Sequence, residues 1–299
     1  MTITTKIDIN SYIKECAAAI EHALDRLVPA QECAQKNLFT AARYSLLGGG
    51  KRIRPILAIA TAEALGASRE SALQPACALE MIHTYSLIHD DLPCMDDDDI
   101  RRGKPSLHRA FPEGLAVLAG DYLLTYAFEV ICNAKHLSTE QRLTLVKILS
   151  DQSGGHGMIA GQVMDIEAEG KSIDLAQLKE THRCKTGALL LASIEFGATI
   201  ANASTAQLQV LRKFGEDIGL AYQIIDDVLD VTASKQKHGK DIGSDILNNK
   251  ATYVTLLGLE KSKALAQKLF NEASQSLNSL NVDTALLLKL AELIVNRTS

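Results

Sequence analysis

Apolar residues recur along this chain with the spacing of α-helices. The stretch LQPACALEMIHTYSLIHDD places Cys77, Met81, Tyr85 and Ile88 three or four positions apart, which puts their side chains on one helical face. All six prolines lie within the first 112 residues, and the alanine- and leucine-rich remainder favours long helices because proline ends or kinks them. Alternating patterns typical of strands are scarce. The sequence therefore predicts an all-α fold.

The distribution of breaks predicts a single domain. Three glycine-containing stretches, LLGGGKR, SGGHG and EFGAT, indicate breaks between helices, but no Ser/Pro-rich linker and no internal repeat divides the chain. With 299 residues, 46% of them hydrophobic, the chain can bury a large core. We expect one helical domain over residues 1–299.

Composition argues against several classes of protein. A net charge of −5, the absence of tryptophan and the lack of a basic and aromatic stripe argue against nucleic-acid binding. The six cysteines lie far apart without CxxC or Cys/His ligand spacing, so neither a disulfide framework nor a zinc site is indicated. The start of the sequence lacks an apolar segment behind a basic head, and no uncharged apolar run reaches the length of a membrane span. We expect a cytoplasmic protein without a membrane span.

Six aspartates crowd residues 89–102, which read HDDLPCMDDDDIRR. Such a segment is usually a solvated acidic loop, because aspartates this close repel one another unless solvent or cations neutralise them. Pro93 cannot continue a helix interior, so we expect Asp90 and Asp91 in a last helical turn and Asp96 returning toward the same point. Carboxylates at the negative end of a helix favour a hard cation, and all-oxygen ligands suit magnesium. The segment lacks the alternating ligands and central glycine of an EF-hand.

A second acidic cluster, QIIDDVLD, ends at Asp230. Asp226 and Asp230 are four residues apart on one helical face, and Asp227 is three residues from Asp230. These aspartates sit within the apolar run GLAYQIIDDVLDV, so they are not a solvated stripe, and buried carboxylates need partners. Two such clusters suggest several magnesium ions.

Basic residues beside flexible glycines supply a counterpart for phosphate. The segment GGGKRIRP offers three cationic side chains to an anion. Lys51 can bind it as a compact point charge, and Arg52 and Arg54 can bind it through two parallel hydrogen bonds each. Basic loops are common, and the segment lacks the GxxxxGK[ST] spacing of a nucleotide-binding loop, so no nucleotide is implied. Magnesium usually binds carboxylates together with substrate phosphates, so basic and acidic clusters complement each other. Further cationic points are Arg101, Arg102, Lys185 with the adjacent Thr186, Lys240 and Lys250.

Together these motifs resemble the trans-prenyltransferases, or polyprenyl diphosphate synthases, and among them the bacterial farnesyl diphosphate synthases. The resemblance spans nearly the whole chain and rests on GGGKRIRP, HDDLPCMDDDDIRRGKPS, GQVMDIEAEG, KTGAL, DDVLD, HGKDIGSD and NKATY. It implies a bundle of long helices around a deep central cavity, usually homodimeric, with the two aspartate clusters facing each other at its mouth. Two positions depart from the pattern: His238 stands where leucine is common, and Tyr222 where phenylalanine often precedes the glutamine.

The resemblance implies a condensation of two diphosphates. Magnesium ions, three per active site or manganese in their place, bridge the diphosphate of dimethylallyl or geranyl diphosphate and act as Lewis acids as the carbon–oxygen bond breaks. Isopentenyl diphosphate presents its double bond to the resulting allylic cation, and proton loss completes the link that leads to farnesyl diphosphate. An apolar, closed cavity keeps water from the cation.

The resemblance also assigns residues to roles. The metal-binding residues are Asp90, Asp91, Asp96, Asp226, Asp227 and Asp230. The residues for isopentenyl diphosphate are Lys51, Arg54, His83 and Arg102, and those for the allylic diphosphate are Arg101, Lys185, Thr186, Gln223, Lys240 and Lys250. Tyr85 lies five positions, or roughly 7.5 Å of helical rise, before Asp90. A bulky aromatic at this depth forms the cavity floor in the family, so Tyr85 and its neighbour Ser86 are assigned to chain length.

Several of these residues also have simpler interpretations. Without the resemblance, His83 is a buried, hydrogen-bonded core histidine, and Tyr85 is ordinary core packing. His89, His156 and Tyr253 are interpreted as structural. Another group either supports the metal ligands or is solvated: Asp97, Asp98 and Asp99.

Other functions compete with farnesyl diphosphate synthesis. Product alternatives are geranyl and geranylgeranyl diphosphate synthases. A class I terpene cyclase uses the same metal-assisted ionisation but has no second diphosphate to hold, so GGGKRIRP argues against it. A non-catalytic regulatory subunit of a heteromeric synthase should have lost an aspartate cluster, and an acidic cation-binding protein leaves the basic residues unexplained.

Overall fold

The computed structural model describes residues 8–233 and 251–297 and confirms the all-α fold. The chain divides into two compact units, one formed by Met1–Lys147 with Thr199–Ala201 and the other by Ile148–Ala198 with Asn202–Ser299. The first unit carries GGGKRIRP and the first aspartate cluster, and the second carries KTGAL and DDVLD. The single domain expected from the sequence stays a prediction.

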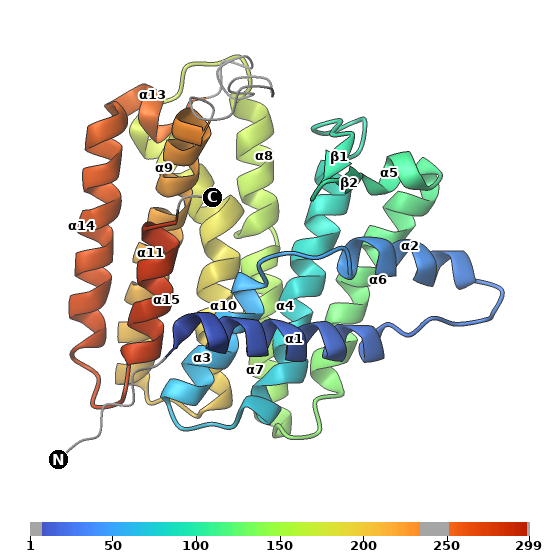
Figure 1. The fold of residues 1–299 in the computed structure, drawn as a ribbon, viewed down its shortest axis with the longest axis horizontal. Coiled ribbons are helices and arrows are strands. Elements are labelled where there is room, and N and C mark those ends of the chain that lie inside the picture. Colours follow the sequence, from blue (N-terminus) through green and yellow to red (C-terminus); the bar gives the residue numbers. More distant parts are fainter. Residues whose placement is uncertain (1–7, 234–250, 298–299) are drawn as a thin grey trace. The chain divides into compact units, whose positions relative to one another are not determined.

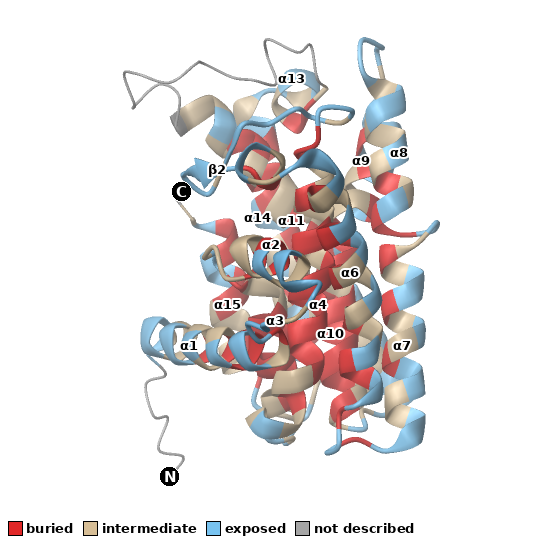
Figure 2. Cartoon of the chain, turned by 90° about the vertical axis from the view of Figure 1, so that its right-hand side faces the viewer, coloured by how far each residue is buried: buried red, intermediate tan, exposed pale blue. Residues whose placement is uncertain are grey.

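Helices make up nearly all of the described first unit (Figure 1). Its elements are α1 (Ile9–Leu27), α2 (Lys36–Leu46), α3 (Ile53–Ala64), α4 (Arg69–Asp90), β1 (Ile100–Arg101), β2 (Lys104–Pro105), α5 (Leu107–Ala110), α6 (Glu113–Cys132) and the beginning of α7 (Thr139–Ser153). The helix α4 contacts both α3 and α6, and buried residues run along much of its length (Figure 2). It is the central helix of this unit.

The described second unit is also helical. After the end of α7 come α8 (Met158–Ala168), α9 (Leu175–His182), the π-helical turn η1 (Arg183–Gly187), α10 (Ala188–Ile200), α11 (Thr205–Ala233), α13 (Tyr253–Leu257), α14 (Leu259–Leu277) and α15 (Ala285–Val295). The helix α11 packs on α14 and α15. With 29 residues, it confirms the long helices predicted for the proline-free part of the chain.

Both ends of α4 follow from local sequence. At its start, the Ser68 hydroxyl accepts a hydrogen bond from the Ser71 backbone amide at 3.2 Å, which caps the helix. At its end, the helix stops at Asp90, before Pro93, as predicted. Between the ends, the predicted apolar face is buried: Cys77, Met81, Tyr85 and Ile88.

A short hairpin that the sequence pattern did not predict follows α4. The strands β1 and β2 contain two residues each and pair antiparallel, with Arg101 opposite Lys104. Arg102 and Gly103 form the turn, with φ values of 55° and 75°. Positive φ at both central residues is typical of a type I′ turn, in which glycine is favoured at the second position. The turn therefore places Arg101 on a strand and Arg102 at the tip.

One predicted break is wrong. The stretches LLGGGKR and SGGHG separate helices as expected, but EFGAT lies within α10. Its glycine, Gly197, is buried. Tertiary packing there outweighs the helix propensity of glycine, which is lower than that of alanine by about 1 kcal/mol.

Among the described residues, one helix, α6, is long and apolar enough to cross a membrane by length and composition alone. This is weak evidence for a span, because the core helix of a soluble protein meets the same criterion. The six cysteines are all free in this structure.

Candidate active site

The end of α4 forms the first acidic cluster in the predicted way. Asp90 is the last residue of the helix, and Asp91 caps it. The chain then turns back, and the Asp96 backbone amide donates a hydrogen bond to the Asp90 carbonyl at 2.8 Å. Asp90 is half-buried and Asp96 is exposed. The backbone therefore brings two acidic residues together at the carboxyl end of a helix, where the macrodipole favours a cation.

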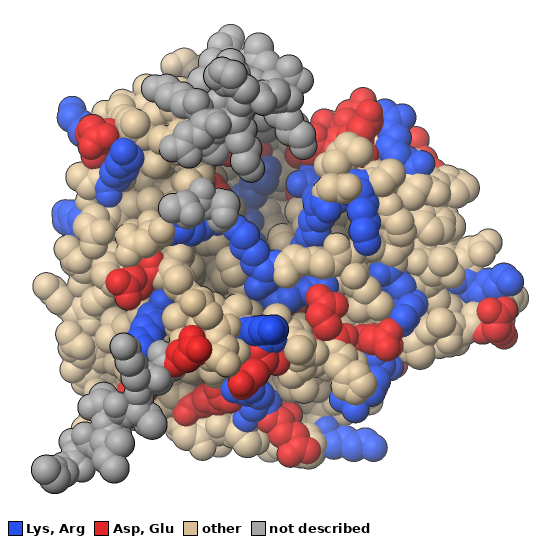
Figure 3. All heavy atoms as spheres, viewed as in Figure 1, with Lys and Arg blue, Asp and Glu red and all other residues tan. Residues whose placement is uncertain are grey.

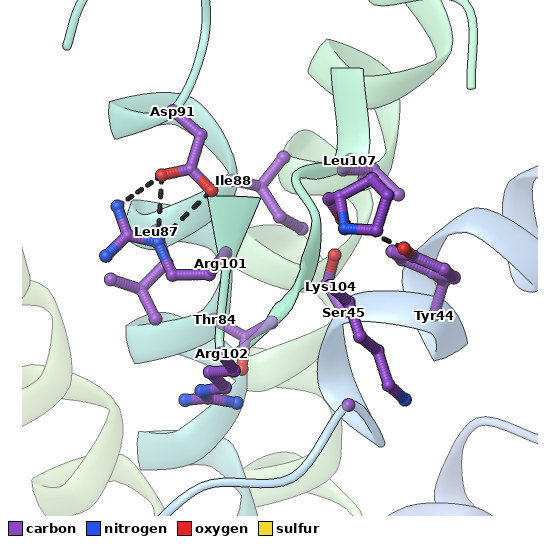
Figure 4. A pocket seen from close by; sticks show the side chains of 12 residues that line it. Tyr44, Ser45, Thr84, Leu87, Ile88, Asp91, Arg101, Arg102, Lys104 and Leu107 are labelled. Carbon is purple, nitrogen blue, oxygen red and sulfur yellow. Dashed lines mark hydrogen bonds and ion pairs between the residues drawn. The ribbon is translucent and has the colours of Figure 1, made fainter. Parts of the chain in front are cut away.

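The neighbouring Asp91 carboxylate is bound within the protein. The Arg101 guanidinium donates hydrogen bonds to both of its oxygens (Figure 4). Arg101 Nη2 also donates a hydrogen bond to Asp98 Oδ2 at 2.8 Å. The Asp91 side chain is only 3% exposed. Burial raises the pKa of Asp91, and Arg101 opposes that rise. A predicted metal ligand and a predicted substrate contact are thus paired with each other in this structure.

The glycine loop before α3 meets the hairpin turn. Gly49 and Gly50 have φ values of 90° and 142°. Arg102 Nη1 donates a hydrogen bond to the Gly49 carbonyl, and a Cβ added at Gly50 would lie 2.9 Å from Arg102 Cζ. Gly49 is therefore needed for its backbone conformation, and Gly50 also for the close approach of the guanidinium. These glycines join GGGKRIRP to the hairpin by defined contacts.

The buried Arg52 anchors the same loop. Its Nη1 bonds Glu80 Oε1 at 2.5 Å, its Nε bonds Glu21 Oε1 at 2.7 Å and its Nη2 bonds the Leu46 carbonyl at 2.6 Å. Arg52 is 2% exposed, so it is not available to an external anion as the sequence suggested. Glu80 Oε1 also lies 3.9 Å from Arg102 Nη2. One buried carboxylate therefore holds arginines from two different segments.

His83 lies among arginines. Burial lowers the pKa of His83 well below its usual range, and nearby positive charges lower it further, from Arg54, Arg102, Arg52 and Arg101. Burial and the charges of Arg52 and Arg101 also lower the pKa of Arg102, although Glu80 and Glu21 act in the opposite direction. A bound anion would relieve this repulsion. The structure thus brings together three residues predicted to bind isopentenyl diphosphate: Arg54, His83 and Arg102.

A pocket in the first unit borders this group (Figure 4). Its lining includes Thr84, Asp91, Arg102 and Lys104. The Thr84 hydroxyl is buried and has no hydrogen-bond partner among the described residues. The pocket shares Asp91 and Arg102 with the candidate site and is therefore part of the same region.

In the second unit, the π-helical turn η1 presents the KTG motif. Such turns are rare and frequently mark functional sites. A Cβ added at Gly161 would lie 2.1 Å from the Lys185 backbone nitrogen, so α8 packs directly on this turn and requires glycine there. Lys185 Nζ donates a hydrogen bond to Asp165 Oδ2 at 2.6 Å. The motif GQVMDIEAEG thus supplies both the space and the countercharge for Lys185.

A chain of hydrogen bonds runs from η1 to α13. Thr186 Oγ1 donates to Gln223 Oε1 at 3.0 Å, and Gln223 Nε2 donates to Asp227 Oδ1 at 3.1 Å. The backbone amide of Tyr253 donates to Asp227 Oδ2 at 2.8 Å. Asp227 is 4% exposed. In this structure, the predicted metal ligand Asp227 orients Gln223 and anchors the start of α13.

Asp226 has a different environment. Arg297 Nη2 donates a hydrogen bond to Asp226 Oδ1 at 2.5 Å and another to the Tyr222 carbonyl at 2.9 Å. The Arg297 guanidinium also lies over the Tyr222 ring, 3.9 Å from its centroid. Asp226 is 37% exposed, and Asp230, one turn further on, is exposed. These two aspartates therefore face outward while Asp227 faces the core.

Tyr85 lies in the core of the first unit. It is 5% exposed, and its ring packs edge-on against His89 at a centroid distance of 5.7 Å. Burial and the charge of Asp90 raise the pKa of Tyr85 to about 12. Its hydroxyl is buried and has no hydrogen-bond partner among the described residues. The adjacent Ser86 hydroxyl donates to the His83 carbonyl at 2.9 Å.

Part of the predicted site lies outside the described residues, namely Lys240 and Lys250, together with the unusual His238. Lys51, the remaining residue predicted for isopentenyl diphosphate, is exposed at the start of α3.

Three positioning residues were missed by sequence reasoning. Asp165 had a signal, because it lies in the motif GQVMDIEAEG, but its pairing with Lys185 was not deduced. No sequence pattern indicated Glu80 or Arg297. Glu80 lies 28 residues from its partner Arg52, and Arg297 lies 71 residues from its partner Asp226.

The donor groups fit magnesium. Asp90, Asp96, Asp226 and Asp230 offer only carboxylate oxygens, and magnesium needs one or two carboxylates per ion when phosphate and water complete its shell. A cationic group, Arg297, already lies on Asp226 in this structure, which shows that the cluster accepts positive charge. The chemistry of both clusters therefore suits a hard divalent cation.

The fold is all-α, and its units carry acidic clusters and basic side chains of the kind that metal-dependent diphosphate chemistry requires. A model of the polyprenyl synthetase family matches residues 35–286. The chain belongs to this family of prenyltransferases.

Named relatives agree with this assignment. The farnesyl diphosphate synthase of Geobacillus stearothermophilus is 45% identical over 98% of this chain and 99% of its own length. The chloroplastic large subunit 1 of a heterodimeric geranylgeranyl pyrophosphate synthase from Arabidopsis thaliana is also 45% identical, over 98% of this chain and 80% of its own length. A solved structure of an FPP/GFPP synthase from Zymomonas mobilis gives a TM-score of 0.87 at 37% identity, covering 96% of this chain and 99% of its own. A relative named for farnesyl diphosphate synthesis and one named for geranylgeranyl pyrophosphate synthesis are thus equally identical to this chain.

Proposed function

We propose that this prenyltransferase condenses isopentenyl diphosphate with dimethylallyl diphosphate and then with geranyl diphosphate, and releases farnesyl diphosphate as its main product. Family membership supports short-chain prenyl transfer. The fifteen-carbon product rests on Tyr85.

The observation that supports this function best lies on one helix. The helix α4 carries His83, which is surrounded by arginines, and Asp90, which is joined to Asp96. Seven residues separate His83 from Asp90, which is about two turns or roughly 10 Å along the same helical face. An anion-binding group and a cation-binding group on one rigid element suit an enzyme that holds a metal-free diphosphate close to a metal-bound one.

Asp90 and Asp96 in the first unit, and Asp226 with Asp230 in the second, are the proposed magnesium ligands. When bound, magnesium supplies Lewis-acid stabilisation of the departing diphosphate. The aspartates would hold the cations, since magnesium usually binds one or two carboxylates together with substrate phosphates and water. Manganese has the same preference for oxygen ligands and is an expected substitute.

The remaining two aspartates position neighbouring side chains in this proposal. Asp91 holds the Arg101 guanidinium in place by hydrogen bonds. The positive charge of Arg101 then attracts the allylic diphosphate. Asp227 fixes the amide of Gln223. Both carboxylates are buried and already hydrogen-bonded, which suits a supporting role better than direct metal binding.

Lys51, Arg54, His83 and Arg102 bind isopentenyl diphosphate in this proposal. The lowered pKa of His83 keeps its ring neutral at neutral pH, so it contributes hydrogen bonding and no charge. The positive charge comes from the lysine and the arginines, and Glu80 helps to hold Arg102 in place. This arrangement binds an anion without a metal ion of its own.

The second unit contributes to the allylic side. Lys185 and Thr186 on η1, with Gln223 on α11, are the proposed contacts within the described residues, and Lys240 and Lys250 complete the set. Asp165 holds the Lys185 ammonium group at 2.6 Å, which reduces the freedom of a long side chain before substrate binds.

Tyr85, with Ser86, limits product length in this proposal. A buried aromatic ring close to Asp90 blocks the path that a growing apolar chain would take. Geranyl and geranylgeranyl diphosphate are the alternative products, and relatives named for geranylgeranyl pyrophosphate synthesis occur alongside those named for farnesyl diphosphate. We also expect a cytoplasmic homodimer that binds no nucleic acid.

Turnover with defined substrates tests the function. Purified protein is incubated with magnesium, isopentenyl diphosphate and either dimethylallyl or geranyl diphosphate, with and without a chelator. We expect metal-dependent condensation with both allylic substrates. No condensation with either substrate would contradict the enzymatic function and favour a non-catalytic subunit.

A further inference from the structure

Asp97, Asp99 and His108 form a cluster that the proposed function does not use. One ligand atom from each, a carboxylate oxygen or a ring nitrogen, lies within 4.8 Å of the other two. The aspartates precede β1, and the histidine lies in α5, after β2. In Figure 3, acidic and basic side chains gather over the part of the first unit that carries these elements.

The His108 ring is oriented as that of a metal ligand. Its side chain is 2% exposed, and Nε2 lies 3.9 Å from Asp97 Oδ1. Nε2 is buried and has no hydrogen-bond partner among the described residues. The other nitrogen, Nδ1, is 3.1 Å from the Oγ of the buried Ser106. Metal-binding histidines usually have their second nitrogen fixed in this way, whereas a buried nitrogen without a partner is unfavourable.

Arg109 provides the positive charge at these carboxylates in this structure. Its Nε donates a hydrogen bond to Asp99 Oδ1 at 2.5 Å, and its Nη2 lies 3.7 Å from Asp97 Oδ1. The Arg109 side chain is 49% exposed, so it can turn into solvent. A cation in its place would neutralise both carboxylates and would also give His108 Nε2 a partner.

We propose that Asp97, Asp99 and His108 bind a divalent transition-metal ion of the zinc class, with water in the remaining position. Two carboxylates balance its charge, and the imidazole selects against magnesium and calcium, which prefer oxygen ligands. Ligand atoms of a tetrahedral zinc site lie about 3.4 Å apart, given metal–ligand distances of about 2.1 Å. In this structure the three ligand atoms lie up to 4.8 Å apart. The Asp97 and Asp99 side chains are 56% and 63% exposed, so they can rotate to shorten these distances.

Such an ion would join the segment after the first aspartate cluster to α5. The hairpin with Arg101 and Arg102 lies between these points in the chain. A bound ion would therefore restrict the movement of the hairpin without contacting substrate. The sequence did not indicate a zinc site because the cysteine and histidine spacing is wrong for one, and only the fold brings this histidine to the aspartates.

A cobalt titration tests the site directly. Full-length, metal-free protein is titrated with Co²⁺ in excess magnesium, which fills all-oxygen sites, and the visible spectrum reports the geometry of bound cobalt. Thiolate ligation, for instance by the exposed Cys94, adds a charge-transfer band in the near ultraviolet. We expect one equivalent of Co²⁺ to bind without that band, and one equivalent of Zn²⁺ to displace it.

Variants with opposite expected effects separate a ligand from a structural histidine. His108→Ala and Ser106→Ala should each weaken Co²⁺ binding by about 10- to 100-fold. Arg109→Gln removes the competing charge and should tighten binding several-fold. His136→Ala changes an exposed histidine that lies 3.7 Å from Glu70, and it should bind as the wild type does.

The outcome is decisive in either direction. Wild-type affinity in His108→Ala, a thiolate band, or no cobalt binding at all would overturn the site. If His108→Ala does not fold, Ser106→Ala and Arg109→Gln decide, and unchanged affinity in both overturns it. The readout is metal binding, so its failure leaves the proposed prenyl transfer unaffected.

Discussion

The guanidinium of Arg52 and the carboxylate of Glu80 form a 2.5 Å ion pair that solvent barely reaches, with side chains 0% and 2% exposed. Arg52 belongs to the glycine loop and Glu80 to α4, and Arg102 lies 3.9 Å from the same carboxylate. Removing one member of a buried pair leaves an uncompensated charge. This contact therefore fixes the loop and Arg102 relative to α4.

Glu80→Ala should destabilise the protein by about 3–5 kcal/mol and raise the KM for isopentenyl diphosphate more than that for the allylic substrate. Urea unfolding and steady-state kinetics measure the two effects. The matched control is Glu180→Ala, which removes an exposed partner of Arg183 and should cost less than about 1 kcal/mol. Equal stability of the two variants, with an unchanged KM, would contradict a positioning role for Glu80.

Asp90→Ala and Asp226→Ala should each lower turnover on the order of 100-fold or more, because a metal ligand acts on charge that develops in the transition state. The helical circular dichroism of Asp90→Ala should be unchanged, since like-charged carboxylates do not stabilise an empty site. Asp226→Ala also removes the partner of Arg297, so its stability is measured by urea unfolding beside its turnover. Asp151→Asn, at an exposed position on α7, is the control. Turnover within a few-fold of the wild type in either variant would refute its metal-binding role.

The two diphosphates should respond to different lysines. A lost charge-assisted contact costs on the order of 1.5–3 kcal/mol, or roughly 10- to 150-fold in affinity. Lys51→Ala should raise the KM for isopentenyl diphosphate, and Lys185→Ala should raise the KM for the allylic diphosphate. The reverse ranking in measured KM values would mean that the two sites are exchanged.

His182 should make the fold sensitive to mild acid. Its pKa is lowered to about 4, mainly by burial; the charge of Asp165 opposes this and the charge of Lys185 adds to it. The buried Nδ1 of His182 has no hydrogen-bond partner among the described residues. The unfolded histidine titrates near pH 6.5, so as pH falls the unfolded state takes up the proton first and stability is lost. Between pH 7 and pH 5 this amounts to about 2 kcal/mol at most.

His182→Asn should remove that part of the pH dependence. Urea unfolding at the two pH values measures it, with His136→Asn, an exposed site, as the control. The same loss of stability on acidification in His182→Asn and in the wild type would assign the effect to other groups.

Local features of the fold were predictable from sequence. The helical spacing of apolar residues predicted the buried face of α4, and Pro93 predicted where the helix ends. Both features depend on residues that lie within a few positions of each other. The return of Asp96 to Asp90 followed from the same short segment. Glycine at EFGAT misled, since buried packing overrode its weak helix propensity.

Contacts between distant segments were not predictable. The two-residue strands are too short to show a period, and the π-helical turn has no pattern that distinguishes it from an α-helix. The pairings of Arg52 with Glu80 and of Arg297 with Asp226 depend on packing that no local spacing encodes. The site was therefore predictable as a set of residues, and its internal pairings were not.

Tyr85 should control product length through its ring and not its hydroxyl. Tyr85→Ala should give products of twenty carbons or more, whereas loss of core packing alone predicts only a stability loss of about 3–5 kcal/mol. Tyr85→Phe keeps the ring and removes a buried hydroxyl that has no partner among the described residues, so it should keep the wild-type product with equal or slightly greater stability. A folded, active Tyr85→Ala with unchanged products would rule out Tyr85 as the floor.

The most direct test of the account is the chain length that the wild-type enzyme produces. Purified protein is given magnesium, dimethylallyl diphosphate and excess isopentenyl diphosphate, and the products are dephosphorylated and separated by chromatography. We predict farnesol as the main alcohol, with geraniol appearing early and then declining. A main product of ten or twenty carbons would contradict farnesyl diphosphate synthesis, and no product in the presence of metal would contradict prenyl transfer itself.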